Sequence, residues 1–201
     1  MELVIASQNS QKVFEIRKIL AEEAPNLNPR SLHDFPDYVP EISLCNTLLE
    51  SAIQKAQKAA LELKVVALSD QYGLVVPALG EEVQAMVNKA SKPQEAQHLC
   101  VRRILDQMKS FSGLDRAAYL ICCLAIAAPD GRTKNATARI EGVIAEAEVG
   151  KADGIFDSIF IKHDYGKTLA QLPQSVQKRV SVRLKAFQKL LSSGIDQFFV
   201  N

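Results

Sequence analysis

Apolar residues recur along this chain with two periods, one typical of strands and the other typical of helices. The apolar run over residues 1–6 predicts a buried strand, and a short polar segment separates it from a helix that begins near Val13. Asn9 or Ser10 is expected to cap this helix, because either side chain can accept a hydrogen bond from a first-turn N–H group. A strand, a polar turn and a helix in this order form a geometry in which the helix N-terminus can hold an anion.

The same patterning predicts further elements along the chain. Thr47 and Glu50 fit a capping box, so a second helix is expected to follow them. An apolar run predicts a central strand over residues 117–127, and residues 134–144 are expected to return from it as a hairpin. The apolar positions of a closing helix lie along one face: Val176, Val180, Leu184, Phe187 and Leu191. Gly194 is expected to end that helix.

Proline marks the connecting regions. Residues 22–44 contain four prolines and are expected to be mostly connection, with a short strand over residues 29–33. Residues 81–108 are expected to form two helical pieces that separate just before Pro93, because proline fits the first turn of a helix.

The stretch from Val65 to Val76 is the strongest functional candidate on pattern alone. It reads as an apolar strand, a polar break at residues 69–73 and a second apolar run. Asp70 at the end of a buried strand is a position at which α/β proteins place a metal or phosphate ligand. The alternative is that Asp70 and Gly73 only form a tight turn between two strands, since both residue types favour turns.

Composition narrows the class of protein. The 201 residues can form one large domain or two small lobes, and 47% of them are hydrophobic. Twenty-four Lys and Arg residues against 23 Asp and Glu residues give a net charge of +1, so no global field attracts nucleic acid or an anionic membrane. The N-terminal residues do not resemble a signal peptide, and a cytoplasmic protein is expected.

The four cysteines give no sign of metal or redox chemistry. Cys45, Cys100, Cys122 and Cys123 lack the spacing of a zinc site or a redox motif. Reduced thiols, without zinc or disulfides, are expected.

Two groups of polar residues are candidates for ligand binding. Residues 7–12 follow the first strand and open the first helix, where backbone N–H groups can hold a phosphate and Lys12 adds a positive charge. An ordinary capped helix explains this segment equally well. Lys55 in the second helix is either a further phosphate ligand or a solvated surface lysine. Asp157 follows Gly154, which permits an unusual turn before a strand-like run.

Taken together, these segments resemble the motifs of the inosine triphosphate pyrophosphatase family. Residues 69–74 read S-D-Q-Y-G-L where the family has A-D-D-S-G-L, and residues 154–160 read G-I-F-D-S-I-F where it has F-G-Y-D-P-I-F. The segments that carry the resemblance are, in chain order, residues 6–12, 47–56, 69–74, 141–144, 154–160, 166–172 and 180–183.

The resemblance implies a fold and an activity. The implied fold is α/β, with an elongated mixed β-sheet, flanking helices and two lobes around a central cleft, all within a single domain over residues 1–201. The implied activity is hydrolysis of the non-standard purine nucleotides ITP, dITP and XTP to the monophosphate and pyrophosphate, with Mg²⁺ as the cofactor. The family also implies a homodimer.

The resemblance assigns roles to individual residues. The substrate-binding candidates are Ser7, Gln8, Asn9, Lys12, Lys55, Tyr72, Phe156, Asp157, Lys178 and Arg183. Within this set, Phe156 and Asp157 are expected to hold the base, and most of the others the phosphates. Asp70 is expected to bind the metal and, with Gln71, to serve the catalytic step.

Departures from the family pattern leave two hypotheses open. Gln71 stands where the family has its general base and metal ligand, and an amide can neither take up a proton nor neutralise a cation. Ser43 stands at the other metal ligand, which leaves Glu41 as a displaced substitute, and Val182 replaces a histidine. The chain is therefore either an active pyrophosphatase or a catalytically degenerate relative that binds a nucleotide or a protein partner without hydrolysis.

Overall fold

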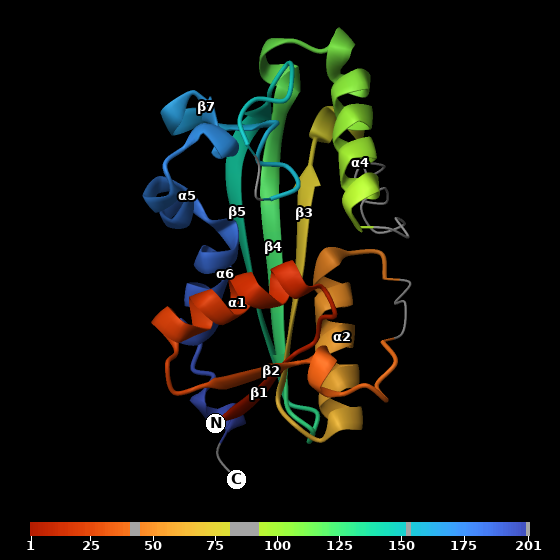
Figure 1. The fold of residues 1–201 in the computed structure, drawn as a ribbon, viewed down its shortest axis with the longest axis vertical. Helices are drawn as coiled ribbons and strands as arrows, with labels where there is room; N and C mark the ends of the chain where they lie inside the picture. The colour runs from red at the N-terminus through yellow and green to blue at the C-terminus, as the bar shows by residue number, and fades with distance from the viewer. Residues whose placement is uncertain (41–44, 81–92, 152–153, 200–201) are drawn as a thin grey trace. The chain divides into compact units, whose positions relative to one another are not determined.

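The structure is a computed structural model that describes residues 1–40, 45–80, 93–151 and 154–199 (Figure 1). Its strands follow the order β2-β1-β3-β4-β5-β6-β7 in a mixed sheet. The chain separates into two compact units, which we call unit 1 (residues 1–72, 122–138 and 183–201) and unit 2 (residues 73–121 and 139–182). The expectation of a single domain with two lobes around a central cleft depends on how these units are placed relative to one another. It stays a prediction.

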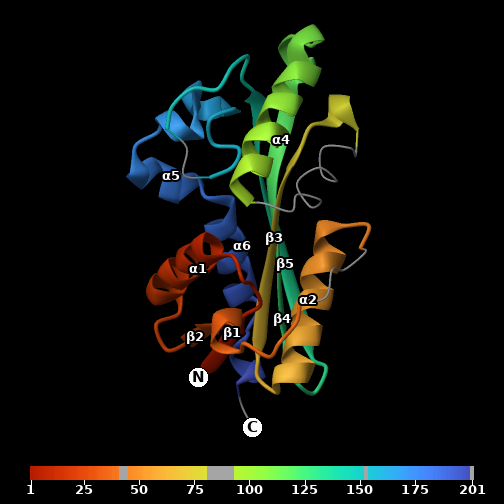
Figure 2. The same ribbon diagram turned by 45° about the vertical axis from the view of Figure 1, so that its right-hand side comes forward.

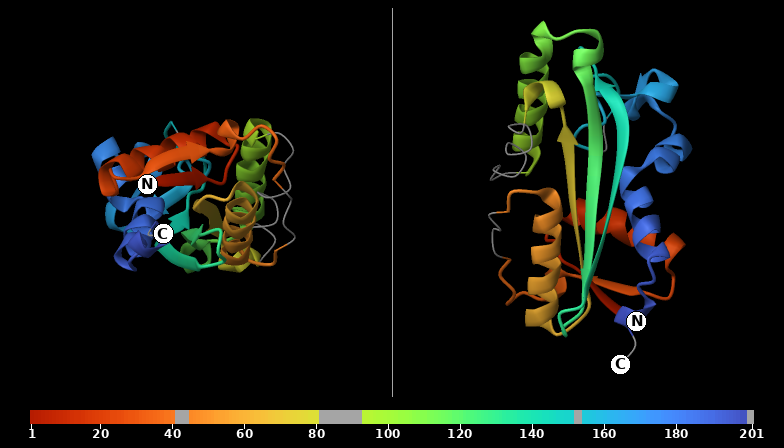
Figure 3. Two further views of the ribbon diagram at one scale, coloured as in Figure 1. Left: turned by 90° about the horizontal axis from the view of Figure 1, so that it is seen from below. Right: turned by 180° about the vertical axis from the view of Figure 1, so that it is seen from behind.

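Unit 1 is built on parallel strands. β1 (Glu2–Ile5) pairs in parallel with β2 (Asn28–Ser31) on one side and with β3 (Ala67–Val75) on the other. α2 (Leu48–Leu63) covers one face of this sheet, whereas α1 (Ser10–Glu23) and α6 (Val182–Ser192) lie on the other face (Figures 2 and 3). The two faces of β3 therefore meet different helices.

The side of α2 that packs on the sheet is made largely of alanine. Ala52, Ala56, Ala59 and Ala60 are all completely buried. Alanine favours the helix and lets its backbone approach the sheet closely. Lys55, which is partly buried on this helix, lies close enough to Lys12 and Asp70 to interact with their charges.

The turn between β4 (Ala117–Ala127) and β5 (Thr133–Ile144) holds the end of the chain within unit 1. The Lys134 ammonium donates to the carbonyl oxygens of Ser193 and Gly194, just after α6. The Arg132 guanidinium donates to the carbonyl of Gln197 over 2.5 Å. These contacts fix the C-terminal end of α6.

The described residues of unit 2 form antiparallel strands and the helices α4 (Pro93–Gln107) and α5 (Gln174–Val180). β6 (Phe160–Lys162) pairs antiparallel with the end of β5 and with β7 (Lys167–Thr168). The buried core includes Phe156, Phe160 and Leu120.

Several elements agree with the sequence-based expectations. Asn9 caps α1 by accepting a 3.0 Å hydrogen bond from the Lys12 backbone N–H. Thr47 and Glu50 form the expected capping box at the start of α2. The strands predicted over residues 117–127 and 134–144 are β4 and β5, and the short strand near residue 29 is β2. The α/β fold class is confirmed.

Two expectations for the central stretch were wrong, namely Asp70 at the end of a strand and, as the alternative, a tight turn at residues 69–73. Residues 67–75 form one continuous strand, β3, so Asp70 and Gly73 do not make a turn between two strands. Turn propensity is a local preference, and here the pairing of β3 with its neighbours overrides it. Asp70 tolerates this buried position because cationic side chains compensate its charge.

The closing helix differs from its prediction as well. It is interrupted at Ser181, whose extended backbone (φ −54°, ψ 117°) separates α5 from α6. The apolar period continues across the break because only one residue leaves the helical conformation. Gly194 follows α6 with φ +78°, as expected for a residue that ends a helix.

One expected element and one candidate residue cannot be compared with the structure. The first helical piece, before Pro93, and the candidate metal ligand Glu41 lie outside the described residues. The second piece is confirmed, since α4 begins at Pro93. Among the helices that are described, none combines the length and the apolar character needed to cross a membrane.

Candidate functional site

The loop after β1 ends beside the middle of β3. β1 and β3 are parallel, with Ile5 opposite Leu68, and the Ala6 N–H donates to the Leu68 carbonyl over 2.7 Å. The chain then turns directly into α1 at Ser10. The positive end of the α1 dipole therefore lies at the carboxyl end of β1, where α/β folds place anionic ligands.

Local hydrogen bonds order this loop. Ser7 Oγ accepts a 3.1 Å hydrogen bond from the Asn9 N–H, and Asn9 in turn caps α1. Gln8 between them is exposed. The three loop residues named by the sequence therefore lie together at the N-terminus of α1, with Lys12 in the first turn.

Asp70 lies at the centre of a network of charges. Its Oδ1 is 3.1 Å from Lys12 Nζ, and its Oδ2 accepts a 3.1 Å hydrogen bond from Arg183 Nε. Lys12 Nζ also donates to the backbone carbonyl of Asp70 over 3.1 Å. Arg183 reaches a second carboxylate, Glu15, through its Nη1. Residues from α1, β3 and α6 thus meet around one carboxylate with a side chain that is 1% exposed.

The network controls the ionisation of its members. Burial disfavours the charged form of Asp70, but the charges of Lys12 and Arg183 outweigh it and hold the pKa of Asp70 below its ordinary value. Burial likewise opposes the charge of Arg183, and the two carboxylates Asp70 and Glu15 raise its pKa nevertheless. Asp70 and Arg183 are therefore both charged at neutral pH.

Lys55 belongs to the same region but has a different environment. Burial lowers its pKa first, and the nearby charge of Lys12 lowers it further, while Asp70 acts in the opposite direction. No carboxylate lies within ion-pair distance of Lys55 in the described part of the chain. Three cations, Lys12, Lys55 and Arg183, thus accompany two carboxylates, and the cluster has an excess of positive charge.

The residues on either side of Asp70 divide between the two faces of β3. Arg183 contacts both Asp70 and the ring of Tyr72, with its guanidinium carbon 5.5 Å from the ring centroid. Asp70 and Tyr72 therefore share the face that α1 and α6 cover. Because side chains alternate along a strand, Ser69 and Gln71 point to the other face, on the side of α2. Both are buried, with exposed fractions of 1% and 8%.

The remaining sequence-based candidates lie in unit 2. The Phe156 ring is completely buried and belongs to the core of that unit. Asp157 Oδ2 accepts a 2.8 Å hydrogen bond from the Gly154 N–H, so its carboxylate stabilises the turn that precedes it. Lys178 is exposed on α5. The structure therefore groups Lys12, Lys55, Asp70, Tyr72 and Arg183 within unit 1, and places these three candidates in the other unit.

Sequence reasoning missed two members of the cluster. Glu15 lies one helical turn after Lys12 on α1, so the i, i+3 spacing of the two charges was the available signal. Ser69 carried no such signal, because its importance depends on its burial and on the faces of β3.

The described residues do not fit a preformed site for a divalent cation. They contain no group of three His, Cys, Asp or Glu side chains that could hold a metal. Asp70 already has a cationic neighbour at each carboxylate oxygen, and Gln71 offers only a neutral amide oxygen. Mg²⁺ prefers one or two available carboxylates together with phosphate and water. The described residues therefore leave Asp70 with no free carboxylate oxygen for such an ion.

Comparison with known proteins identifies the family. The sequence model of the Ham1 family matches residues 3–193. The chain belongs to the Ham1 family. The resemblance to inosine triphosphate pyrophosphatases is thereby confirmed.

Relatives and solved structures agree with this assignment. The chain is 34% identical to the dITP/XTP pyrophosphatase of Chlamydia trachomatis serovar D, over 94% of this chain and 91% of that protein. It is 33% identical to the dITP/XTP pyrophosphatase of Protochlamydia amoebophila, over 94% and 96% of the two proteins. The Staphylococcus aureus Ham1 protein has a similar fold, with a TM-score of 0.82, 27% identity and coverage of 96% of this chain and 97% of that one. A HAM1 protein from Coxiella burnetii gives a TM-score of 0.79 at 25% identity, with coverage of 96% and 100%.

This Ham1 family member keeps the fold over nearly its whole length. The charged cluster of unit 1 also lies within the matched residues. Gln71, however, places an amide in the middle of that cluster.

Proposed function

We propose that this protein hydrolyses non-standard purine nucleoside triphosphates, of the inosine, deoxyinosine or xanthosine type, to the monophosphate and pyrophosphate. The observation that carries the proposal is the cluster of Lys12, Lys55 and Arg183 at the N-terminus of α1, which has more positive than negative charge. Its relatives named dITP/XTP pyrophosphatase support the choice of substrate.

The phosphates are proposed to bind at the carboxyl end of β1. The first-turn N–H groups of α1 and the loop from Ser7 to Asn9 offer donors there, and Lys12 and Lys55 offer charge. Arg183 is held close by Asp70 and Glu15, so a triphosphate would meet a guanidinium that is already oriented. Asp70 acts in this proposal as a positioning residue for the two cations.

The reaction is attack of water on the α-phosphorus with departure of pyrophosphate. Negative charge grows on the leaving pyrophosphate as the bridging bond breaks, and cations already in place stabilise it without further reorganisation. The carbonyl oxygen of Gln71 can orient the water by accepting a hydrogen bond, but it cannot take up the proton. The proton is therefore released to solvent or to the phosphate itself, and slow turnover is expected.

Recognition of the base is proposed for the turn that carries Phe156 and Asp157, on the resemblance of residues 154–160 to the family motif. The Phe156 ring is completely buried and supports this turn from the core, so Asp157 is the group proposed to contact the base. The contact between Asp157 and the Gly154 N–H keeps this carboxylate in a fixed position. The resemblance also supports a homodimer and a cytoplasmic location. Light scattering at assay concentration would test the dimer.

The test is pyrophosphate release from a panel of nucleoside triphosphates, with ITP, dITP and XTP beside ATP and GTP. Lys12→Met is expected to lower turnover about 100-fold, because it removes a charge that stabilises the leaving group. Lys18→Met is the matched control, since Lys18 is exposed on the same helix and is outside the cluster. It should behave as the wild type.

Two results would contradict the proposal. The first is absence of pyrophosphate release from every triphosphate, with and without Mg²⁺, by wild-type protein that still binds a nucleotide. That result would favour the catalytically degenerate relative, which the amide at Gln71 makes the second candidate. The second is an equal loss of turnover in Lys12→Met and Lys18→Met, which would show that turnover does not depend on the cluster.

Asp70→Asn should also reduce turnover, because Lys12 and Arg183 lose the carboxylate with which both of them pair.

A further inference from the structure

β3 presents opposite polar chemistry on its two faces. On the face covered by α1 and α6, Asp70 is ion-paired with Lys12 and Arg183. With Glu15, the second partner of Arg183, two carboxylates balance the two cations on this face.

The other face is covered by α2 (Figures 2 and 3). There the strand contributes the neutral side chains of Ser69 and Gln71, by alternation along β3, and Lys55 of α2 supplies the charge. On this second face, Lys55 has no carboxylate partner in the described part of the chain.

The polar groups on the α2 face lack partners. Ser69 Oγ is buried and forms no hydrogen bond. The Gln71 residue is 8% exposed, and within the described ranges its amide makes no side-chain hydrogen bond. A buried polar group left unsatisfied costs about 1–3 kcal/mol, so the buried Ser69 hydroxyl calls for a partner. Ser69 and Gln71 at alternate positions of one strand therefore offer groups with which a ligand can exchange hydrogen bonds.

The charge of Lys55 indicates that this ligand is an anion. Its pKa is lowered by burial and by the neighbouring charge of Lys12, so the folded protein holds an ammonium in surroundings that disfavour it. An anion beside Lys55 would favour the charged ammonium and so oppose both effects. A divalent cation would instead add two positive charges near Lys12 and Lys55, where Asp70 is already paired with Lys12 and Arg183.

We propose that the α2 face of β3 binds the phosphates of the nucleotide without a divalent cation, with Gln71 and Ser69 as donors and Lys55 as the counter-charge. The amide N–H of Gln71 donates to a phosphate oxygen at the position where a carboxylate would need a metal to bridge the two anions. The amide oxygen stays available for a water molecule. This inference rests on the proposed function, since it specifies how the same ligand is held.

The experiment compares binding in EDTA with binding in excess Mg²⁺. Isothermal titration calorimetry of the wild-type protein with inorganic tripolyphosphate, and with an inosine triphosphate analogue whose α,β-bridge is methylene, measures the dissociation constant in both buffers. Mg²⁺ is expected to change the affinity by less than tenfold, which corresponds to about 1.4 kcal/mol. Tightening by tenfold or more would overturn the proposal. If Glu41→Gln then removed that tightening, Glu41 would be assigned to the metal.

The variant Gln71→Asp should make phosphate binding depend on Mg²⁺, unlike binding by the wild type. A carboxylate in place of the amide repels the phosphates, so binding in EDTA should weaken by at least about tenfold, and Mg²⁺ should restore it. Gln71→Ala is the matched control: it loses the donor, weakens binding a fewfold and gains no dependence on Mg²⁺. Thermal unfolding of each variant identifies any loss of fold. Equal behaviour of Gln71→Asp and wild type in EDTA would overturn the proposal.

The two proposals fail separately. A protein that binds tripolyphosphate in EDTA but releases no pyrophosphate from any nucleotide retains this inference and loses the pyrophosphatase activity. A protein that turns over ITP but binds only with Mg²⁺ retains the activity and loses this inference.

Discussion

Arg183 in unit 1 and Arg116 in unit 2 are both half-buried, but their surroundings differ in charge. Arg183 contacts the carboxylates of Asp70 and Glu15 and the ring of Tyr72. Arg116 donates only to neutral carbonyl oxygens, those of Met108, Phe111, Ile144 and Ala145, over 2.6–3.1 Å.

This difference separates an arginine that can bind a ligand from one that holds the scaffold. The carbonyl oxygens around Arg116 belong to segments that need its donors to satisfy their own hydrogen bonds. The carboxylates around Arg183 orient a guanidinium that lies among other cations, so a phosphate can join the group. Residue type alone does not distinguish the two roles, but the charge of the partners does.

Arg116→Met should give the largest effect on stability. It leaves up to four carbonyl groups of unit 2 without their donor, and we expect the free energy of unfolding to fall by about 3–4 kcal/mol. Urea denaturation measures the change. Arg139→Met is the control, because Arg139 is 63% exposed and its contacts, an ion pair with exposed Glu141 and a guanidinium 5.6 Å from the Tyr119 ring centroid, are weak at the surface. This variant should cost less than about 0.5 kcal/mol. Similar losses in both variants would remove the scaffold role of Arg116.

Gly142→Ala should damage the same scaffold by another route. A Cβ atom there would lie 2.2 Å from the Ile161 carbonyl oxygen and 2.7 Å from the Phe160 ring, across the β5–β6 pair. The strands must separate, and we expect a loss of about 3 kcal/mol in urea denaturation. Binding of tripolyphosphate by the folded fraction should be unchanged, since the cluster lies in unit 1. Weaker binding at equal folded fraction would contradict the separation of site and scaffold.

Arg183→Met should lower the free energy of unfolding by an amount that depends on pH. The pKa of Asp70 is lowered in the folded protein, so its ionised form stabilises the fold at pH values above the unfolded value of 3.8. This contribution is lost as the pH falls through the folded pKa. Without Arg183 the folded pKa of Asp70 rises and the contribution shrinks, by about 2 kcal/mol at neutral pH.

Unfolding free energies from pH 2 to pH 7 would measure this difference. The gap between wild type and Arg183→Met should close as the pH falls below the range in which Asp70 titrates in the wild type. The same series on Arg116→Met should show a gap that hardly depends on pH, because carbonyl groups do not titrate. A pH-independent gap for Arg183→Met would show that its ion pair with Asp70 does not stabilise the fold.

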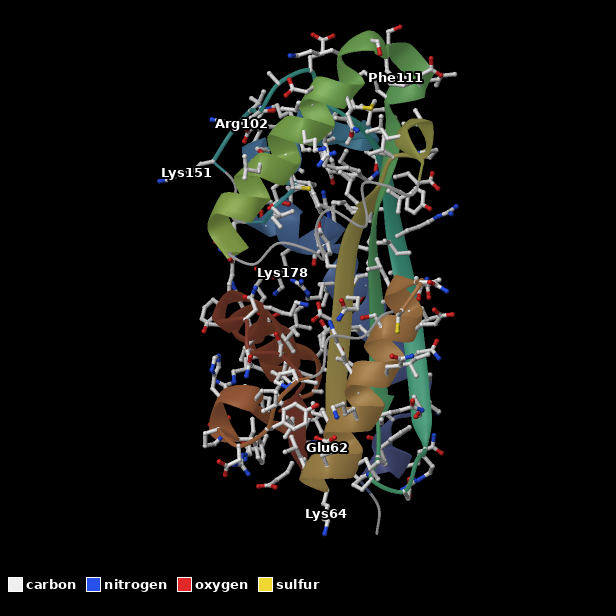
Figure 4. All side chains as sticks on the ribbon, turned by 90° about the vertical axis from the view of Figure 1, so that its right-hand side faces the viewer. Glu62, Lys64, Arg102, Phe111, Lys151 and Lys178 are labelled. Atoms are coloured by element: carbon white, nitrogen blue, oxygen red, sulfur yellow. The ribbon has the colours of Figure 1, made fainter. Side chains whose placement is uncertain are left out.

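Lys64→Gly should give the smallest effect, and a gain. Lys64 follows α2 with φ +55°, the left-handed region that side chains disfavour, and it lies at the end of that helix, pointing away from it (Figure 4). Glycine at this position should stabilise the protein by about 0.5–1 kcal/mol. Lys18→Gly, within α1, should instead cost about 1 kcal/mol. Calorimetric melting temperatures that move in the same direction for both would contradict this explanation.

Local interactions could be predicted from the sequence itself. Long-range interactions could be predicted only through the resemblance to the inosine triphosphate pyrophosphatase family. Asn9 and Thr47 cap their helices through partners three residues away, so their roles follow from spacing. Arg183 and Asp70 are separated by 113 positions, and no local pattern brings them together. The turn expected at residues 69–73 shows the reverse case, in which local preference was clear and the sheet overrode it.

The neutral face of β3 was the least predictable part of the candidate site. The sequence shows Gln71 in place of an acid, which indicates that the family's general base and metal ligand is lost at this position. Only the burial of Ser69 and Gln71, and the position of α2 across from them, indicates what the replacement could bind.

The contacts between the C-terminal end of the chain and the β4–β5 turn mean that α6 is held at both of its ends. Near its first residue Arg183 is held by Asp70, and just beyond its last residue the carbonyls of Ser193 and Gly194 are held by Lys134. A helix advances about 1.5 Å per residue, so sliding by even one residue would break contacts at both ends. The β4–β5 turn, which contacts the far end of α6, therefore helps to fix the position of the Arg183 guanidinium.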